Sequence, residues 1–219
     1  MPAYISRPES SKRLPALIFV FDIFGSTSEM KRVADDFAAG GYVVMMPDLF
    51  SRGSWFSCIR KLIADIKAGS GRNVQDLLDA RAWLTGRDYV DAAHTATIGF
   101  CMGGAFALIL AKSGVFRVSA PFYGNAPAKL DGACPIVASY GERDKPLLAD
   151  FDKVKQEVER LNIPNDLKLY PDAGHGFMSR IPNKVLDFLM SKSPAHAGYN
   201  TEAAADAKAR VLSFLEAHI

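Results

Sequence analysis

The chain has 219 residues, of which 49% are hydrophobic and 23% are charged, and its formal net charge is +2. This length and composition suit one globular domain with a sizeable core, and the small net charge gives no electrostatic basis for binding nucleic acid. The N-terminal apolar run at residues 14–21 is too short to span a bilayer, so we expect no membrane segment. These exclusions leave a small molecule as the expected partner.

The three cysteines, Cys58, Cys101 and Cys134, are an odd number at irregular spacings, which matches neither a disulfide framework nor a zinc site. Unpaired thiols are typical of a reducing compartment, so we expect a cytoplasmic location. No group of His, Cys and acidic residues in the sequence has metal-ligand spacing, and no glycine-rich stretch has the form of a phosphate or dinucleotide loop. We therefore expect no cofactor.

The first predicted elements alternate between strand and helix. The apolar run at 16–21 is typical of a strand buried on both faces. A capping serine and apolar residues at helical spacing predict an amphipathic helix over 28–39, and a second strand follows at 42–46. Two strands joined through one helix form a parallel, right-handed unit.

The stretch from 49 to 71 is less regular, with Trp55 and Phe56 followed by a basic helical segment. A segment with several aromatic residues after a strand either forms the wall of a pocket or packs against the core without a functional role. An amphipathic helix is predicted over 73–84, and the strand that follows it ends at residue 100.

The second half of the chain continues the alternation. Strands are predicted at 117–123, 135–140 and 166–170, with Pro121 bending the first of them at its end. Helices are predicted over 148–161 and 202–218. No internal repeat or linker marks a boundary, so we expect residues 1–219 to form a single α/β domain with a doubly wound, mostly parallel sheet and helices on both faces.

The most informative stretch is Gly-Phe-Cys-Met-Gly-Gly at 99–104, which joins a buried strand to an apolar helix. A side chain at the apex of a strained strand-to-helix turn needs neighbours without Cβ atoms, and Gly99 and Gly103 flank Cys101 in this way. The helix N-terminus directs its positive dipole end at the sulfur, which favours a thiolate. A nucleophile is indicated, and the alternative is a buried, inert cysteine in a glycine-rich turn.

Two further residues follow strand ends: Asp144 comes after the strand at 135–140, and His175 comes after the strand at 166–170. Because the carboxyl ends of parallel strands meet at one edge of a sheet, we expect both side chains to lie near Cys101. Their order along the chain is nucleophile, acid, histidine. In this arrangement His175 takes the thiol proton and Asp144 orients the imidazole.

Asp22 directly follows the first buried strand. A carboxylate at such a position is costly unless something there requires it, and ligands bind at these strand ends. Asp22 is therefore a candidate site residue, and the alternative is a solvated loop aspartate that caps the next turn.

Five segments of the chain together resemble one family, the dienelactone hydrolases or carboxymethylenebutenolidases of the α/β-hydrolase superfamily. They are Asp-Ile-Phe-Gly at 22–25, Gly-Tyr-Val-Val at 41–44 with Pro-Asp-Leu at 47–49, Gly-Phe-Cys-Met-Gly-Gly at 99–104, Tyr-Gly-Glu-Arg-Asp at 140–144 and Ala-Gly-His-Gly-Phe at 173–177. The resemblance implies the α/β-hydrolase fold and cleavage of esters or lactones through an acyl-cysteine intermediate, with Cys101, Asp144 and His175 as the triad.

The resemblance also implies roles for other residues. The backbone N–H groups of Met102 and Ile23 correspond to the family's oxyanion hole. Asp22 stands where the family has a glutamate that gates the nucleophilic thiol, and it is one methylene shorter. Family members bind a substrate carboxylate through arginines, for which Arg60 and Arg180 are the candidates here.

Four aromatic residues, Trp55, Phe56, Tyr123 and Phe177, are expected to flank the catalytic loops and to favour compact, flat substrates. Two other functions stay open at this point. One is a general carboxylesterase of the same fold without dienelactone activity, and the other is a thiol redox sensor in which Cys101 is oxidised and reset. We expect a monomer or a small homo-oligomer.

Overall fold

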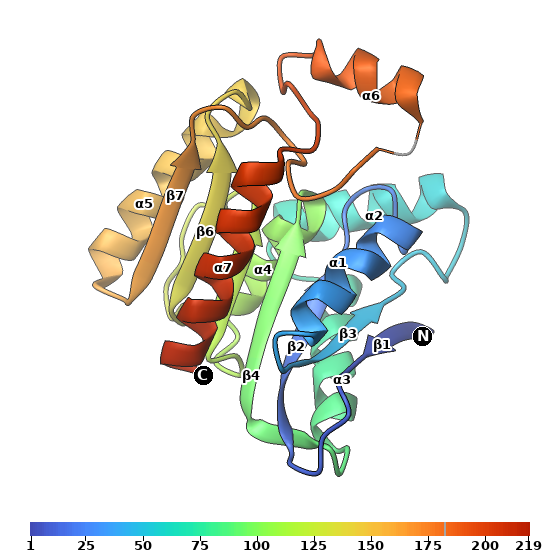
Figure 1. Cartoon of the computed structure of the whole chain (residues 1–219). Coiled ribbons are helices and arrows are strands. Elements are labelled where there is room, and N and C mark those ends of the chain that lie inside the picture. The colour runs from blue at the N-terminus through green and yellow to red at the C-terminus, as the bar shows by residue number, and fades with distance from the viewer. Residues whose placement is uncertain (182) are drawn as a thin grey trace.

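A seven-stranded sheet runs through the part of the chain that the computed structural model describes, residues 1–181 and 183–219 (Figure 1). The strand order is β1-β3-β2-β4-β5-β6-β7, in which β1 pairs antiparallel with β3 and the other neighbours pair in parallel. The strands are β1 (Ala3–Ser6), β2 (Leu14–Val20), β3 (Val43–Pro47), β4 (Val90–Phe100), β5 (Val118–Phe122), β6 (Ile136–Gly141) and β7 (Asn165–Tyr170).

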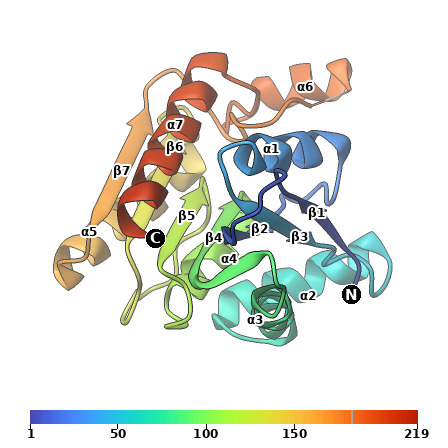
Figure 2. The ribbon, with the colours of Figure 1, turned by 60° about the horizontal axis from the view of Figure 1, so that its bottom comes forward.

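Helices cover both faces of this sheet. Figure 2 shows α1 (Ser28–Ala38) and α7 (Thr201–His218) on one face. The opposite face is covered by α2 (Trp55–Ala68), α3 (Arg72–Thr85), α4 (Met102–Ala111) and α5 (Leu148–Leu161). The doubly wound α/β architecture expected from the sequence is thereby confirmed.

The helix α4, which follows the turn at Cys101, lies at the centre of the packed core. Every residue of α4 is buried, and the helix packs against β4 and β5 on one side and against α2 and α3 on the other. A helix that is apolar all round needs such a fully enclosed place. Its N-terminus, and with it Cys101, is consequently held at a fixed point of the sheet edge.

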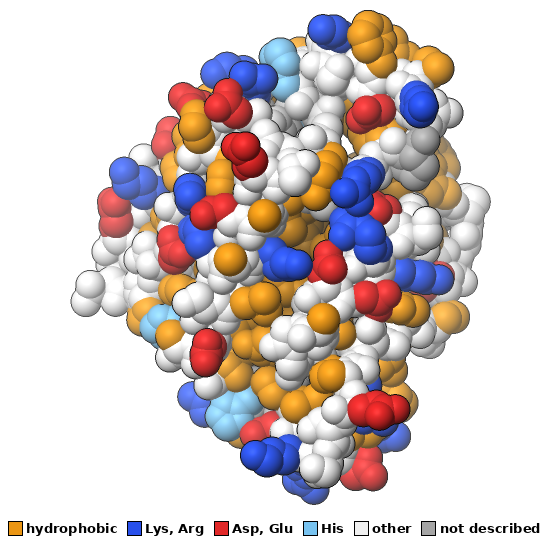
Figure 3. All heavy atoms as spheres, in the orientation of Figure 1, with side chains coloured by type: hydrophobic (Ala, Val, Ile, Leu, Met, Phe, Trp, Pro, Cys, Tyr) orange, Lys and Arg blue, Asp and Glu red, His pale blue; other side chains and the backbone are white. Residues whose placement is uncertain are grey.

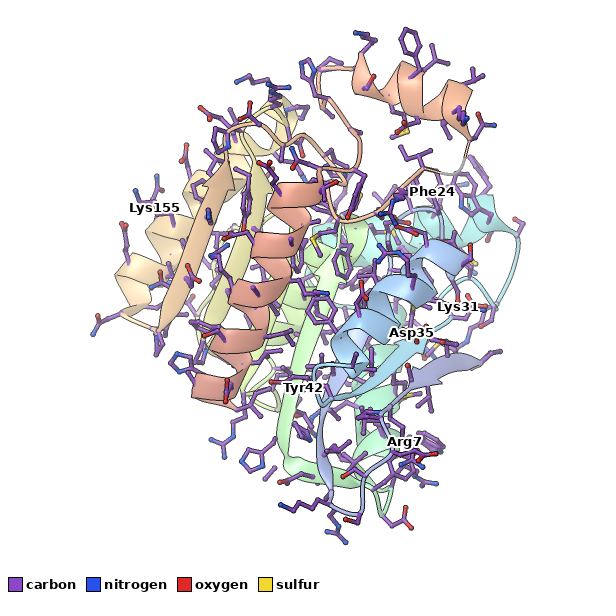
Figure 4. All side chains as sticks on the ribbon, in the orientation of Figure 1. Arg7, Phe24, Lys31, Asp35, Tyr42 and Lys155 are labelled. Atoms are coloured by element: carbon purple, nitrogen blue, oxygen red, sulfur yellow. The ribbon has the colours of Figure 1, made fainter. Side chains whose placement is uncertain are left out.

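Two elements were not predicted from the sequence. One is β1, a short edge strand, which α1 holds through the hydrogen bond from the Tyr4 hydroxyl to Asp35 (2.8 Å; Asp35 is labelled in Figure 4). The other is α6 (Lys184–Ser191), which lies beyond the carboxyl ends of the strands and contributes no buried residue. In Figure 3 hydrophobic side chains are visible along this outlying helix. Of the helices that the structure describes, none is long and apolar enough to cross a membrane.

The expectation that Pro121 bends the end of its strand is wrong. Pro121 lies inside β5 and pairs with Gly99 of β4. On the β6 side Ser119 pairs with Ile136 and Phe122 with Ser139, and the pairing is interrupted between them, where Pro121 cannot donate a backbone hydrogen bond. Pro121 therefore interrupts the pairing of β5 with β6 only, and the pairing of β5 with β4 continues through it to Phe122.

Candidate active site

Cys101 stands at the apex of the turn between β4 and α4. Its φ of 57° lies in the left-handed region that side chains rarely adopt. The turn can close only because Gly99 and Gly103 have no Cβ atom. A Cβ atom at Gly99 would overlap the carbonyl of Gly103, and one at Gly103 would overlap the carbonyl of Val20. The close approach of strand and helix thus requires both glycines, as the sequence pattern indicated.

The sheet edge brings the acid and the histidine to the same place. Asp144 follows β6, His175 follows β7, and Asp144 Oδ2 lies 2.6 Å from His175 Nδ1. Asp144 is 1% exposed, so water does not compete for this hydrogen bond. The Cys101 thiol is near enough to His175 to help raise the pKa of the imidazole. The order Cys101, His175, Asp144 is the spatial arrangement of a nucleophile, its base and an orienting acid.

The environment of His175 favours its charged form. Burial by itself lowers the pKa of the imidazole, but the hydrogen bonds and charges of Asp144 and Cys101 together raise this pKa above its ordinary value. An imidazole with a raised pKa holds its proton more firmly beside the sulfur. The arrangement therefore favours a protonated imidazole next to Cys101.

Two backbone N–H groups remain free beside the sulfur. The N–H of Met102 begins α4, and that of Ile23 follows β2; in residues 1–181 and 183–219 neither donates to a protein acceptor. The indole Nε1 of Trp55 donates to the Ile23 carbonyl at 3.0 Å and so restrains the Ile23–Phe24 peptide, which adjoins the peptide that carries the Ile23 N–H. Both N–H groups are available for an oxyanion.

A cavity of about 560 Å³ opens onto Cys101. One wall is apolar and comes from Ile59, Ile63 and Ile66 of α2. Sequence reasoning missed this wall, although three isoleucines at i, i+4 and i+7 share one helix face and were the available signal. The stretch at 49–71, whose sequence pattern was less regular, therefore contains the helix α2 that forms one wall of the site.

Two lysines, Lys67 of α2 and Lys153 of α5, also line the cavity that holds Cys101. Lys153 Nζ lies 3.4 Å from Asp150, whereas Lys67 forms no ion pair with any described residue. Lys67 is consequently the cation of this cavity whose charge is free for a ligand. The sequence held no motif that pointed to it.

The aromatic residues are not placed as expected. Tyr123 and Phe177 are buried behind the site: the Tyr123 ring centroid lies 5.0 Å from that of His175 and 5.2 Å from that of Phe177. A φ of 38° at Tyr123 turns its side chain into the core instead of the cavity. Trp55 and Phe56 are exposed at the start of α2 and lie outside the lining of the cavity. The expectation that these four residues form its wall is therefore wrong.

The two arginines expected near the substrate also lie elsewhere. Arg60 is exposed on α2 and lines neither the Cys101 cavity nor its neighbour. The guanidinium of Arg180 stacks 4.4 Å above the Tyr199 ring and lines a second cavity. Neither arginine can serve the Cys101 cavity from its present position.

Asp22 lies at the edge of this second cavity. It is 9% exposed, and its Oδ1 accepts a hydrogen bond from the Phe24 N–H at 2.9 Å. Burial raises the pKa of Asp22 to about 6, although the Phe24 N–H and the charge of His175 act in the opposite direction. Asp22 thus caps the turn, as one interpretation held, but it is nearly buried and not solvated as that interpretation had it, and its charge interacts with that of His175. Among the described residues no cluster of three or more His, Cys, Asp or Glu side chains could hold a metal ion.

Comparisons with known proteins agree with this geometry. The model of the dienelactone hydrolase family matches residues 1–219. A Bradyrhizobium sp protein, provisionally named 2-oxo-3-(5-oxofuran-2-ylidene)propanoate lactonase, is 32% identical over 80% of this chain and 78% of its own length. An Escherichia coli K12 protein, provisionally named carboxymethylenebutenolidase, is 28% identical over 81% of this chain and 73% of its own.

Solved structures show the same fold. A protein from Klebsiella pneumoniae subsp. pneumoniae MGH 78578, provisionally named dienelactone hydrolase, superimposes with a TM-score of 0.78 at 23% identity, over 99% of this chain and 92% of that one. A dienelactone hydrolase-like promiscuous phosphotriesterase from metagenomic libraries gives a TM-score of 0.79 at 21% identity over the same shares. With the family model covering the whole chain, the protein belongs to the dienelactone hydrolase family and has the α/β-hydrolase fold.

Proposed function

We propose that this hydrolase cleaves carboxylic esters or lactones through an acyl-cysteine intermediate, with Cys101 as nucleophile, His175 as base and Asp144 as orienting acid. The observation that carries the proposal is the position of His175, which bonds Asp144 at 2.6 Å and is near enough to Cys101, at its strained turn, for the thiol to affect the pKa of the imidazole. The provisional name of the Bradyrhizobium relative supports lactones as substrates beside open-chain esters.

In the first half of the reaction the Cys101 thiolate attacks the carbonyl carbon, and the carbonyl oxygen becomes an oxyanion. The N–H groups of Met102 and Ile23 are placed to donate to that oxygen. As the tetrahedral intermediate collapses, the carbon–oxygen ester bond breaks, and the His175 imidazolium protonates the departing alkoxide. An alcohol leaves, or in a lactone the ring opens, and the acyl group stays on the sulfur.

In the second half His175, now neutral, takes a proton from water, and the hydroxide attacks the acyl carbon. The carbon–sulfur bond breaks, the thiolate of Cys101 leaves and the carboxylic acid is released. The imidazolium that forms is stabilised by the buried Asp144 carboxylate, whose Oδ2 bonds His175 Nδ1. The enzyme returns to its thiolate–imidazolium state.

The cavity beside Cys101 indicates the substrate class. Its isoleucine wall suits an apolar carbon skeleton, and the unpaired Lys67 suits a carboxylate at the far end of that skeleton. An ester or lactone that also carries an acid group meets both requirements. In this chain Lys67 would bind the substrate carboxylate, the role for which the resemblance had suggested an arginine.

A burst experiment tests the mechanism. Mixing the enzyme with p-nitrophenyl acetate should release one equivalent of nitrophenol per active site before steady turnover, and the mass of the quenched protein should rise by one acetyl group. Cys101→Ala should abolish both signals, with Cys134→Ala as the matched control because that thiol is also free. Steady turnover by Cys101→Ala at the wild-type rate would contradict the acyl-cysteine mechanism.

A pair of substrates tests the role of Lys67. We expect Lys67→Met to raise KM for the monomethyl ester of a dicarboxylic acid by about tenfold and to leave KM for the dimethyl ester nearly unchanged. Lys61→Met, on the same helix and exposed outside the cavity, is the control. Equal KM changes for both esters would favour a general carboxylesterase without acid recognition.

A further inference from the structure

A cavity of about 610 Å³ lies at the end of the sheet opposite Cys101. Its lining comes from the places where β4, β5 and β6 begin, at residues 92–93, 114–117 and 134–135, and from His218 at the end of α7. Figure 1 shows the start of β4 and the C-terminal end of α7 at this end of the sheet, away from α6. Along β4 the distance from Thr95 to Cys101 is about 20 Å, at about 3.3 Å per residue. The cavity is therefore separate from the candidate active site.

Two arginines, Arg81 of α3 and Arg117 just before β5, line this cavity. Arg81 Nε donates to Thr95 Oγ1 at 3.0 Å, and Arg117 Nε donates to the Ala93 carbonyl at 3.3 Å. The backbone N–H of Arg117 also donates to the Thr95 carbonyl, at 2.8 Å. Both guanidinium groups are thus held next to the same short stretch of β4, residues 93–95.

Buried groups fix the direction of the Arg81 side chain. Thr95 is 1% exposed, and its hydroxyl accepts from Arg81 while it donates to the Val115 carbonyl at 3.1 Å. The Arg81 Cζ lies 5.7 Å from the centroid of the buried Phe116 ring, which adds a cation–π contact. These contacts engage Nε, whereas the terminal nitrogens of Arg81 have no hydrogen-bond partner among the described residues. They are the donors that a ligand in the cavity can use.

Neither guanidinium has a counter-ion in the part of the chain that the structure describes. No ion pair joins Arg81 or Arg117 to a carboxylate, whereas the partly buried Arg210 bonds Asp166. Burial lowers the pKa of Arg81, and no carboxylate acts against that effect. Two like charges beside one strand without a counter-ion are costly, and an anion bound in this cavity offsets the cost.

The rest of the lining indicates which kind of anion fits. The His218 imidazole adds a possible N–H donor, and among the described residues no acidic side chain lines the cavity. Val115 and Pro135 supply apolar surface. A phosphate dianion matches two guanidinium charges better than a single carboxylate does, and the guanidinium fork fits its oxygens. The volume lies within the 300–1,000 Å³ that is usual for small-molecule sites, so an organic group fits beside the phosphate.

We propose that this cavity is a binding site for a small phosphate monoester, whose phosphate lies between Arg81 and Arg117 and whose organic group lies on Val115 and Pro135. The site is distinct from the ester chemistry at Cys101, and binding there requires no turnover. Free phosphate and a phosphate ester share the group that the arginines bind. The apolar surface distinguishes the two, because only the ester reaches it.

Calorimetric titrations with phenyl phosphate and with inorganic phosphate test the proposal. Phenyl phosphate should bind saturably at a single site, with a Kd at least about threefold below that of inorganic phosphate. Arg117→Met should raise the Kd of phenyl phosphate about tenfold, and because Arg117 is exposed this change does not disturb the core. Arg13→Met is the matched control: Arg13 is also exposed and its Nε also donates to a backbone carbonyl, but it lies outside the cavity lining.

A second measurement locates the ligand. In NMR titrations of the wild-type protein, phenyl phosphate should shift the imidazole signals of His218 saturably and leave those of His175 in place. Lys67→Met removes the free cation of the Cys101 cavity and should leave the Kd of phenyl phosphate unchanged.

Four results would overturn the proposal. The first is no saturable binding of phenyl phosphate below about 10 mM. The second is an equal increase in Kd in Arg13→Met and Arg117→Met, which would show only a general attraction to positive charge. The third is loss of binding in Lys67→Met, or NMR shifts confined to His175, either of which would place the anion at the Cys101 cavity. The fourth is equal or tighter binding of inorganic phosphate, which would refute an ester as the ligand.

Discussion

Asp22→Asn should stabilise the folded protein in a strongly pH-dependent way. Burial raises the pKa of this carboxyl group from 3.8 to about 6, which means that the folded site disfavours the charged form. Each unit of pKa corresponds to about 1.4 kcal/mol, so a shift of about two units costs the folded state about 3 kcal/mol once the group is ionised in both states. Asparagine keeps the oxygen that accepts the Phe24 N–H and carries no charge.

The pH dependence follows from the two pKa values. Below about pH 4 Asp22 is protonated in the folded and in the unfolded chain, and its ionisation contributes nothing to stability. Between about pH 4 and pH 6 the unfolded chain loses this proton first, so the wild type loses stability as the pH rises. Above about pH 6 the full penalty is present, and only the wild type carries it.

Urea unfolding followed by circular dichroism at about pH 4 and about pH 8 measures this difference. The free energy of unfolding of Asp22→Asn should exceed that of the wild type by about 3 kcal/mol more at the higher pH than at the lower pH. Asp48→Asn is the matched control, because Asp48 also follows a buried strand and accepts the N–H of the residue two positions on, from a less buried place. An equal effect of Asp22→Asn at both pH values would refute the reasoning from burial.

Three further outcomes are expected. Asp22→Asn should speed the alkylation of Cys101 by iodoacetamide near neutral pH, because it removes a negative charge that disfavours the thiolate; an unchanged pH profile of labelling would show that Asp22 does not gate the thiol. Asp144→Asn should lower kcat about 100-fold or more, yet by less than His175→Ala, since the base survives without its orientation; a wild-type rate in an ester assay would remove Asp144 from the triad. Trp55→Phe should lower kcat about tenfold with little change in KM, because the indole restrains the carbonyl side of Ile23, whose N–H is proposed to bind the oxyanion, and a change confined to KM would argue instead for substrate contact.

The sequence alone determined most of the fold. Buried strands appear as continuous apolar runs, and helices carry caps and apolar spacing, so α1 and α5 begin and end within a residue or two of their predicted bounds. The elbow around Cys101 was also visible, because only glycine can stand where backbone carbonyls approach so closely. Element order then placed Asp144 and His175 at the same sheet edge, since parallel strands share their carboxyl ends.

What lines the cavities was decided only by the tertiary structure. A residue next to a strand end, such as Tyr123, turns toward the core or toward the cavity according to one backbone angle, and the sequence does not specify that angle. Lys67 lies far from Cys101 along the chain and lines the same cavity because α2 packs against α4. Side-chain direction in loops and on helix faces depends on such long-range packing. For this reason the meeting of Cys101, Asp144 and His175 at one sheet edge was predictable, while the lining of the cavity was not.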